Sequence, residues 1–218
     1  MNEIDIIKQH YLANWHEFTE HLVKDGPICE VLPCLSVLEF APSDTRNSWT
    51  YATCGMSGND GQQGLVRQGL GQRRLGQQNL EQQNSSQQDL RQQGLELFIL
   101  SPTRNAFLIQ LLTAVAHYHA SGNLLGEGHT VNFGCSWVEG SSCDHGLISL
   151  PYLDGPAMEW LESESLESGD KRIQFLWLIP ITSDEVEYKK THGLEALETL
   201  FEEASFNYID PFRKSVVR

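Results

Sequence analysis

Apolar residues recur at two different spacings along this chain, and the spacing predicts which segments are helices and which are strands. Residues 1–24 carry apolar side chains three to five positions apart, which predicts one amphipathic helix ended by the breaker Asp25-Gly26-Pro27. Between residues 28 and 56 the pattern changes to short runs separated by a turn. These runs predict the strands Val37–Phe40 and Trp49–Cys54.

The second half of the chain mixes buried-type strands with helices. Ser101-Pro102 predicts the start of a helix over Thr103–Ala120, because Ser is a good N-cap and Pro is favoured at the first helical position. Thr182, with Glu185 three residues later, is a capping box that opens another helix. No strict strand-helix-strand rhythm appears, so we expect an α+β (mixed α/β) fold, a mixed β-sheet flanked by helices. The remaining predicted elements are the strands Leu97–Leu100, Thr130–Phe133, Gly146–Leu150 and Ile173–Ile181, the last one central, and a helix over Leu194–Ala204.

Residues 62–96 differ in kind, because they fall into seven pentads with leucine at six of the seven equivalent positions. A period of five matches neither a helix nor a strand, so regular structure cannot keep these leucines on one face. One alternative is a square β-solenoid of the pentapeptide-repeat type, but seven pentads would complete fewer than two of its turns. We favour a Gln-rich, disordered loop insertion over residues 59–94 within a single domain, 1–218.

The net negative charge of the chain excludes some classes of binding partner. The chain carries 29 acidic and 15 basic residues, a formal charge of −14, and no basic stripe. Nucleic acid and anionic membrane surfaces are therefore not expected as partners, since both are bound by clustered Lys and Arg. Five scattered cysteines, no CxxC pair, no signal-peptide pattern and no apolar run of membrane-spanning length indicate a cytoplasmic protein with reduced thiols.

One stretch invites a chemical interpretation: Cys143-Asp144-His145, directly ahead of a predicted strand. Alternate side chains of a strand share a face, so Cys143 and His145 would point together. With His117 they could form a thiol enzyme or a metal site, although His117 and His119 lie about 200° apart on a helix and cannot bind one metal from the same face. No catalytic or nucleotide-binding motif accompanies them, and we expect no cofactor, metal or catalytic residue. The alternative, a Cys/His enzyme or metal-binding protein, stays open.

Several longer runs match a known family. The chain resembles the suppressor-of-fused family, in its bacterial single-domain form, over nearly everything outside the pentads. The matching runs, in this order, are ELFILSP (96–102), LLTAVAHYHA (111–120), GHTVNFG (128–134), CDHGLISLPYLDGP (143–156), FLWLIPIT (175–182) and GLEALE (193–198).

This resemblance implies a mixed α/β fold, no enzymatic activity and a polypeptide partner. Animal members restrain Gli-type transcription factors in Hedgehog signalling, and they bind a short peptide as an added strand between this domain and a second one. The 218 residues contain no counterpart of that second domain, so Gli binding does not carry over. Bacterial members are proposed as immunity proteins, which suggests a toxin or a regulatory protein as the partner.

Four residues are candidates for partner binding. Tyr118, at the end of a predicted helix, and His129, after the lip 126–128, correspond best to the family's peptide-facing region. Tyr152 and Asp154 lie in the turn that follows the strand Gly146–Leu150 and either face a partner or shape the turn. The loops 126–129, 154–156 and 210–211 have turn chemistry, and their functional alternative is a groove that receives an extended peptide by strand addition.

Overall fold

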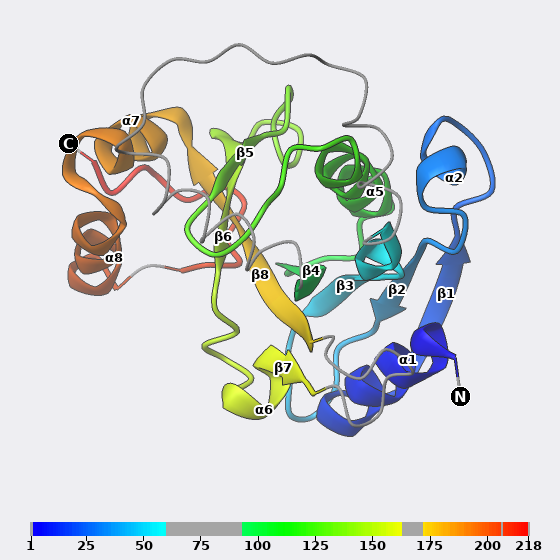
Figure 1. Cartoon of the computed structure of the whole chain (residues 1–218). Coiled ribbons are helices and arrows are strands. Elements are labelled where there is room, and N and C mark those ends of the chain that lie inside the picture. The colour runs from blue at the N-terminus through cyan, green and yellow to red at the C-terminus, as the bar shows by residue number, and fades with distance from the viewer. Residues whose placement is uncertain (1, 60–92, 163–171, 206, 218) are drawn as a thin grey trace, which may run out of the picture.

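The computed structural model describes residues 2–59, 93–162, 172–205 and 207–217. In these ranges the strands form one mixed eight-stranded sheet in the order β1-β2-β3-β4-β8-β6-β5, with β7 paired to β8 beside this path (Figure 1). All neighbours are antiparallel except β4 and β8, which run parallel. The strands are β1 Phe18–Leu22, β2 Ser36–Phe40, β3 Trp49–Cys54, β4 Gln93–Ser101, β5 Thr130–Asn132, β6 Cys143–Ser149, β7 Trp160–Leu161 and β8 Arg172–Thr182.

Helices cover both faces of the sheet, so the molecule has two apolar cores. On one face, α5 (Phe107–Ala120) and the short α2 (Ile28–Val31) pack over the sheet; the 3-10 turn η1 (Met56–Asn59) lies beside them. On the other face lie α1 (Glu3–Asn14), α6 (Pro156–Glu159), α7 (Ser183–His192) and α8 (Leu194–Glu203). Figure 1 shows α5 and α1 on opposite sides of the strands. The predicted α+β class is confirmed.

Strand β8 occupies the centre of the sheet, as its apolar sequence predicts. Leu176 and Leu178 belong to the core under α5, whereas Phe175 and Trp177 belong to the opposite core. Side chains of a strand alternate between faces, so a strand covered on both sides must be apolar at nearly every position. Its end passes directly into α7 through the predicted capping box, in which Thr182 and Glu185 bond each other's backbone.

The prediction for the first 24 residues is wrong beyond Asn14. The helix α1 ends there, and Phe18–Leu22 forms the edge strand β1, paired with β2. Phe18 and Leu22 are four residues apart, a spacing that fits one face of a helix and one face of a strand equally well. Pairing with a segment distant in sequence decides between the two. Ile28–Val31, expected within a β region, is a helical turn.

Two other boundaries differ from the prediction because strands are longer than their apolar runs. Ser101 ends β4 and donates its hydroxyl to the carbonyl of Thr103, so α5 begins only at Phe107, where Asn105 Oδ1 accepts from the backbone N–H. The strand predicted at Gly146–Leu150 begins at Cys143 and takes in the polar lead-in.

Most of the insertion predicted at 59–94, namely residues 60–92, lies outside the described residues. Its last residues belong to the fold, because β4 starts at Gln93 and pairs with β8 from there. Leu95 and Glu96, which end the last pentad, are buried. The boundary placed at residue 94 therefore lies inside a strand. No helix among the described residues is long and apolar enough to cross a membrane.

Candidate functional site

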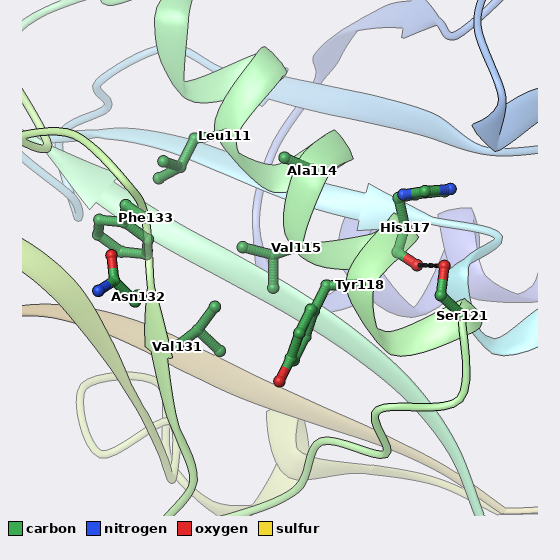
Figure 2. Close-up of a pocket in the computed structure, with 9 residues that line it drawn as sticks. All are labelled: Leu111, Ala114, Val115, His117, Tyr118, Ser121, Val131, Asn132 and Phe133. Atoms are coloured by element: carbon green, nitrogen blue, oxygen red, sulfur yellow. Dashed lines mark hydrogen bonds between the residues drawn. The ribbon is translucent and has the colours of Figure 1, made fainter.

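A cavity of about 420 Å³ opens between α5 and the edge strand β5. Its walls are mainly apolar. Figure 2 shows the Tyr118 ring beside Val131, whereas the His117 ring points away from the cavity. This volume lies within the range typical of ligand pockets. The cavity is lined by Leu111, Ala114, Val115, His117, Tyr118, Ser121, Val131, Asn132 and Phe133.

The helix α5 supplies one wall through its last three turns. Leu111 and Val115 are buried, and Tyr118 follows on the same side of the helix at a spacing of three, with 47% of its surface exposed. The helix ends where the Ser121 hydroxyl donates to the carbonyl of His117 and Gly122 adopts a φ of +98°. This turn at the end of the helix leaves Tyr118 at the mouth of the cavity.

The strand β5 supplies the opposite wall and an open edge. In the described part of the chain it pairs only with β6, at the end of the sheet. His129 O accepts from Ile148 and Phe133 N donates to Asp144, so residues 129, 131 and 133 turn their backbone groups toward β6. By the alternation of an antiparallel ladder, the N–H and C=O groups of Thr130 and Asn132 face away from the sheet. An edge of this kind can pair with another extended segment.

Glycine at position 146 fixes the position of the Phe133 ring. A Cβ atom at Gly146 would lie 2.8 Å from Phe133 Cζ and 2.5 Å from Leu178 Cδ1. A larger residue at position 146 would displace the Phe133 ring or the Leu178 side chain, because real Cβ atoms do not approach other atoms so closely. The sequence motif CDHG thus shapes the cavity through its glycine.

A buried histidine anchors the lip that leads into β5. His119 is 8% exposed, and its Nδ1 accepts a hydrogen bond of 3.0 Å from the N–H of Leu125. Burial lowers the pKa of His119 to about 4, so the ring is neutral near pH 7. The neutral ring connects the last turn of α5 to Leu125, directly before the lip.

The four predicted partner residues do not come together in one place. Tyr118 lines the cavity, and His129 is exposed immediately before β5 but outside the lining. Tyr152 is 59% exposed and lines a different cavity, whose floor residues Leu147 and Ile179 belong to the opposite core.

Asp154 serves the interior of the molecule. One carboxylate oxygen accepts a 2.8 Å hydrogen bond from Trp15 Nε1 and forms an ion pair with Arg46. The Arg46 guanidinium also lies 4.8 Å from the centre of the Trp15 ring. With only 7% of its side chain exposed, Asp154 ties the turn after β6 to the end of α1.

The Cys143–His145 pair is not brought together, contrary to the strand alternation expected from sequence. The register of β6 against β8 shifts between these two residues, and such a bulge reverses the alternation. Cys143 is buried in the core under α5, whereas His145 pairs with Ile181, whose side chain belongs to the opposite core. Burial raises the pKa of the Cys143 thiol, which disfavours the reactive thiolate.

His145 and His117 likewise have other surroundings. His145 Nδ1 lies 2.7 Å from the carboxylate of its neighbour Asp144, and His117 lies on α5 at the cavity rim. Over the residues that the structure describes, no group of three His, Cys, Asp or Glu side chains could hold a metal ion. The geometry therefore gives no support to the Cys/His alternative.

The site residues that sequence reasoning missed are Val131, Phe133 and the apolar positions of α5. Their residue types are those of any core, so no local signal distinguishes them. In the described part of the chain, the fold and the site together define an α+β domain in which the edge strand β5 lies beside an apolar cavity walled by α5.

The family follows from comparison of sequences. The family model "Suppressor of fused protein (SUFU)" matches residues 32–214, most of the chain, and the protein belongs to this family. The predicted resemblance is confirmed. A search of curated proteins finds no match.

Solved structures of the same family share the fold. A suppressor-of-fused homologue from Neisseria gonorrhoeae FA 1090 superposes with a TM-score of 0.74 at 29% identity, over 99% of this chain and 97% of that one. The chain in a Sufu-Fu complex gives 0.58 at 15% identity, over 98% and 90%. Drosophila Suppressor of Fused also gives 0.58, at 14% identity, and the match spans 98% of this chain but 50% of the Drosophila chain.

Proposed function

We propose that this protein is a non-enzymatic binding domain that receives an extended segment of a partner polypeptide by strand addition to β5. The observation that carries the proposal is the open edge of β5 beside the apolar cavity under α5. Backbone hydrogen bonds to Thr130 and Asn132 would supply affinity. A partner side chain inserted beside Tyr118 would supply specificity.

Membership of the family supports a polypeptide ligand. One relative of the same fold was crystallised as a Sufu-Fu complex, that is, with a protein partner. Within the proposal, the partner of this chain is a toxin or a regulatory protein, and binding neutralises it. Its setting is the cytoplasm, in keeping with the reduced thiols expected from sequence; all five cysteines are free in the structure.

The test removes the outward backbone donor of β5 without touching its ladder to β6. Thr130→Pro deletes an N–H that faces away from the sheet, and proline is tolerated on edge strands for this reason. We expect Thr130→Pro to keep its melting temperature within a few degrees and to lose binding of the native partner by about tenfold or more, measured by titration with a partner purified from the source cells. Thr130→Ala, which keeps the N–H, is the matched control.

A second pair of variants tests the cavity. Tyr118→Ala removes the ring at the cavity mouth, and Phe107→Ala removes an exposed ring at the far end of the same helix. We expect only Tyr118→Ala to weaken the partner, by about 1–3 kcal/mol, the usual cost of truncating an aromatic anchor. Equal binding by Thr130→Pro, Tyr118→Ala and the unaltered protein would refute the β5 groove as the binding site.

A further inference from the structure

A second cavity, of about 160 Å³, lies over the other face of the same end of the sheet. Its floor is apolar, made by Leu147 of β6, Ile179 of β8 and Phe201 of α8. A volume of this size holds roughly five water molecules or the end of one long side chain. The cavity shares no lining residue with the cavity beside β5.

Two tyrosines and two carboxylates form the walls and rim of this second cavity. Tyr208 is held in place by contacts with Trp177 and Phe201, with ring centres 5.3 and 6.4 Å away. Tyr152 projects from the turn after β6 with 59% of its surface exposed. Glu198 and Glu202 stand four residues apart on α8, so they lie on one side of the helix.

The two carboxylates at this cavity belong to Glu198 and Glu202 of α8. Among the described residues, no lysine, arginine or histidine forms an ion pair with Glu198 or Glu202. Burial raises the pKa of Glu198 above its ordinary value, and three neighbouring carboxylates raise it further: Glu127, Glu202 and Glu195. A positive charge placed in the cavity would relieve this repulsion.

The same combination of an aromatic ring and a carboxylate holds an arginine elsewhere in this molecule. The guanidinium group lies over the ring and pairs with the acid, because its planar, weakly hydrated cation suits both. Three such sets occur in the described residues: Arg46 with Trp15 and Asp154, Arg104 with Trp49 and Glu39, and Arg172 with Trp160 and Glu162.

We propose that the cavity formed by Tyr152, Tyr208, Glu198 and Glu202 binds an arginine side chain of a partner polypeptide. The guanidinium stacks between or against the tyrosine rings and donates hydrogen bonds to the carboxylates, while its methylene stem covers the apolar floor. Leu153, 64% exposed and next to Tyr152, offers an apolar contact to a residue beside the arginine. This surface is separate from the β5 groove and does not depend on the function proposed for it.

The probe is the peptide acetyl-Ala-Leu-Arg-Leu-Ala-amide, and its matched control carries citrulline, which has the shape of arginine without the charge. Binding is followed by NMR of the ring signals of the six tyrosines in the chain. We expect saturable shifts of the Tyr152 and Tyr208 signals with the arginine peptide and none with the citrulline peptide. Glu198→Gln should weaken binding about fivefold, in line with a partly exposed charge pair.

Two controls distinguish binding at this cavity from nonspecific attraction to an acidic protein and from binding at the β5 groove. Glu203→Gln makes the same charge change on the same helix, at an exposed position outside the cavity, and should alter binding by less than about twofold. Tyr118→Ala should leave the arginine response unchanged. The proposal fails if citrulline binds as well as arginine, if Glu203→Gln weakens binding as much as Glu198→Gln, or if free arginine binds as tightly as the peptide.

Discussion

At the scale of single residues, His119 links acidity to stability. Its pKa is lowered to about 4 by burial, whereas an unfolded chain protonates histidine near 6.5. The unfolded state therefore binds more protons between these values, and stability falls as the pH drops from 6.5 to about 4. The full effect of this one group is on the order of 3 kcal/mol. Protonation also removes the acceptor for Leu125, so we expect the lip ahead of β5 to loosen first.

The measurement compares the unaltered protein with His119→Asn by urea unfolding at pH 7.5 and pH 4.5. Asparagine can present an oxygen near the position of Nδ1 and does not titrate. The loss of unfolding free energy on acidification should be smaller in the variant by about 2–3 kcal/mol. Because carboxylates titrate equally in both proteins, the difference isolates the histidine. An identical acid response would contradict the assignment.

Residue-level prediction from sequence is limited by contacts between residues that are distant in the chain. The sequence allows Asp154 either to face a partner or to shape a turn, and the structure shows that its carboxylate contacts Trp15 and Arg46. Those partners lie more than a hundred positions away in the chain, beyond the reach of any local pattern. Likewise, the bulge that separates Cys143 from His145 depends on the register against β8.

At the scale of elements, one buried ion pair joins the C-terminal segment to α7. The two terminal guanidinium nitrogens of Arg213 each donate to one carboxylate oxygen of Glu185 at 2.8 Å, and Arg213 also donates to the carbonyl of Pro180. Glu185 simultaneously completes the capping box with Thr182 and accepts from the N–H of Val216. One carboxylate therefore fixes the start of a helix and the end of the described chain.

We expect Arg213→Met to destabilise the protein by about 3–5 kcal/mol, since it leaves a buried carboxylate without its cation. Adding Glu185→Gln should restore part of this loss, because the amide oxygen still caps the helix and no bare charge remains. Lys190→Met, which breaks an exposed ion pair with Glu187, should cost less than about 1 kcal/mol. Urea unfolding of the four proteins measures these values, and equal costs for the buried and exposed pairs would refute the argument.

Element prediction succeeded for segments whose pattern has a single interpretation. The sequence predicts the strand β8 and the capping box of α7 correctly, because a long apolar run and a Thr-x-x-Glu motif each favour one structure. The prediction for Phe18–Leu22 is wrong because its spacing fits two structures and its pairing partner, β2, lies further along the chain, beyond α2. The open edge of β5, on which the proposed site depends, follows from strand order and has no signature in the sequence.

At the scale of the whole molecule, both proposed sites use the same end of the sheet. Val131 and Phe133 line the cavity under α5, while Leu147 and Ile179 line the cavity under α8. The strand β6 lies between them, with its residues alternating toward the two faces. The stretch that most resembles the family, CDHGLISLPYLDGP, thus builds parts of both: Gly146 under Phe133 on one face, and Tyr152 on the other.

The pentad block is the remaining feature of the whole chain, and the structure places its junctions within one hydrogen-bonded cluster. Glu96, fully buried in β4, accepts from the backbone N–H groups of Gly55 and Ser57 and from the hydroxyl of Thr53. These bonds join the segment before residue 60 directly to the segment after residue 92. The two segments that flank the pentads are thus held together by hydrogen bonds between described residues.

Replacing residues 60–92 with a short Gly-Ser linker should therefore leave the domain folded, with a melting temperature unchanged or slightly raised, since a shorter connection costs less entropy to close. Extending the deletion to residue 94 removes the positions that pair with Arg172 and Ile173, so that variant should melt at a lower temperature. Circular dichroism during heating compares both with the full chain. A large drop in melting temperature on the 60–92 replacement would mean that the pentads pack as a solenoid against the domain, and the insertion hypothesis would be wrong.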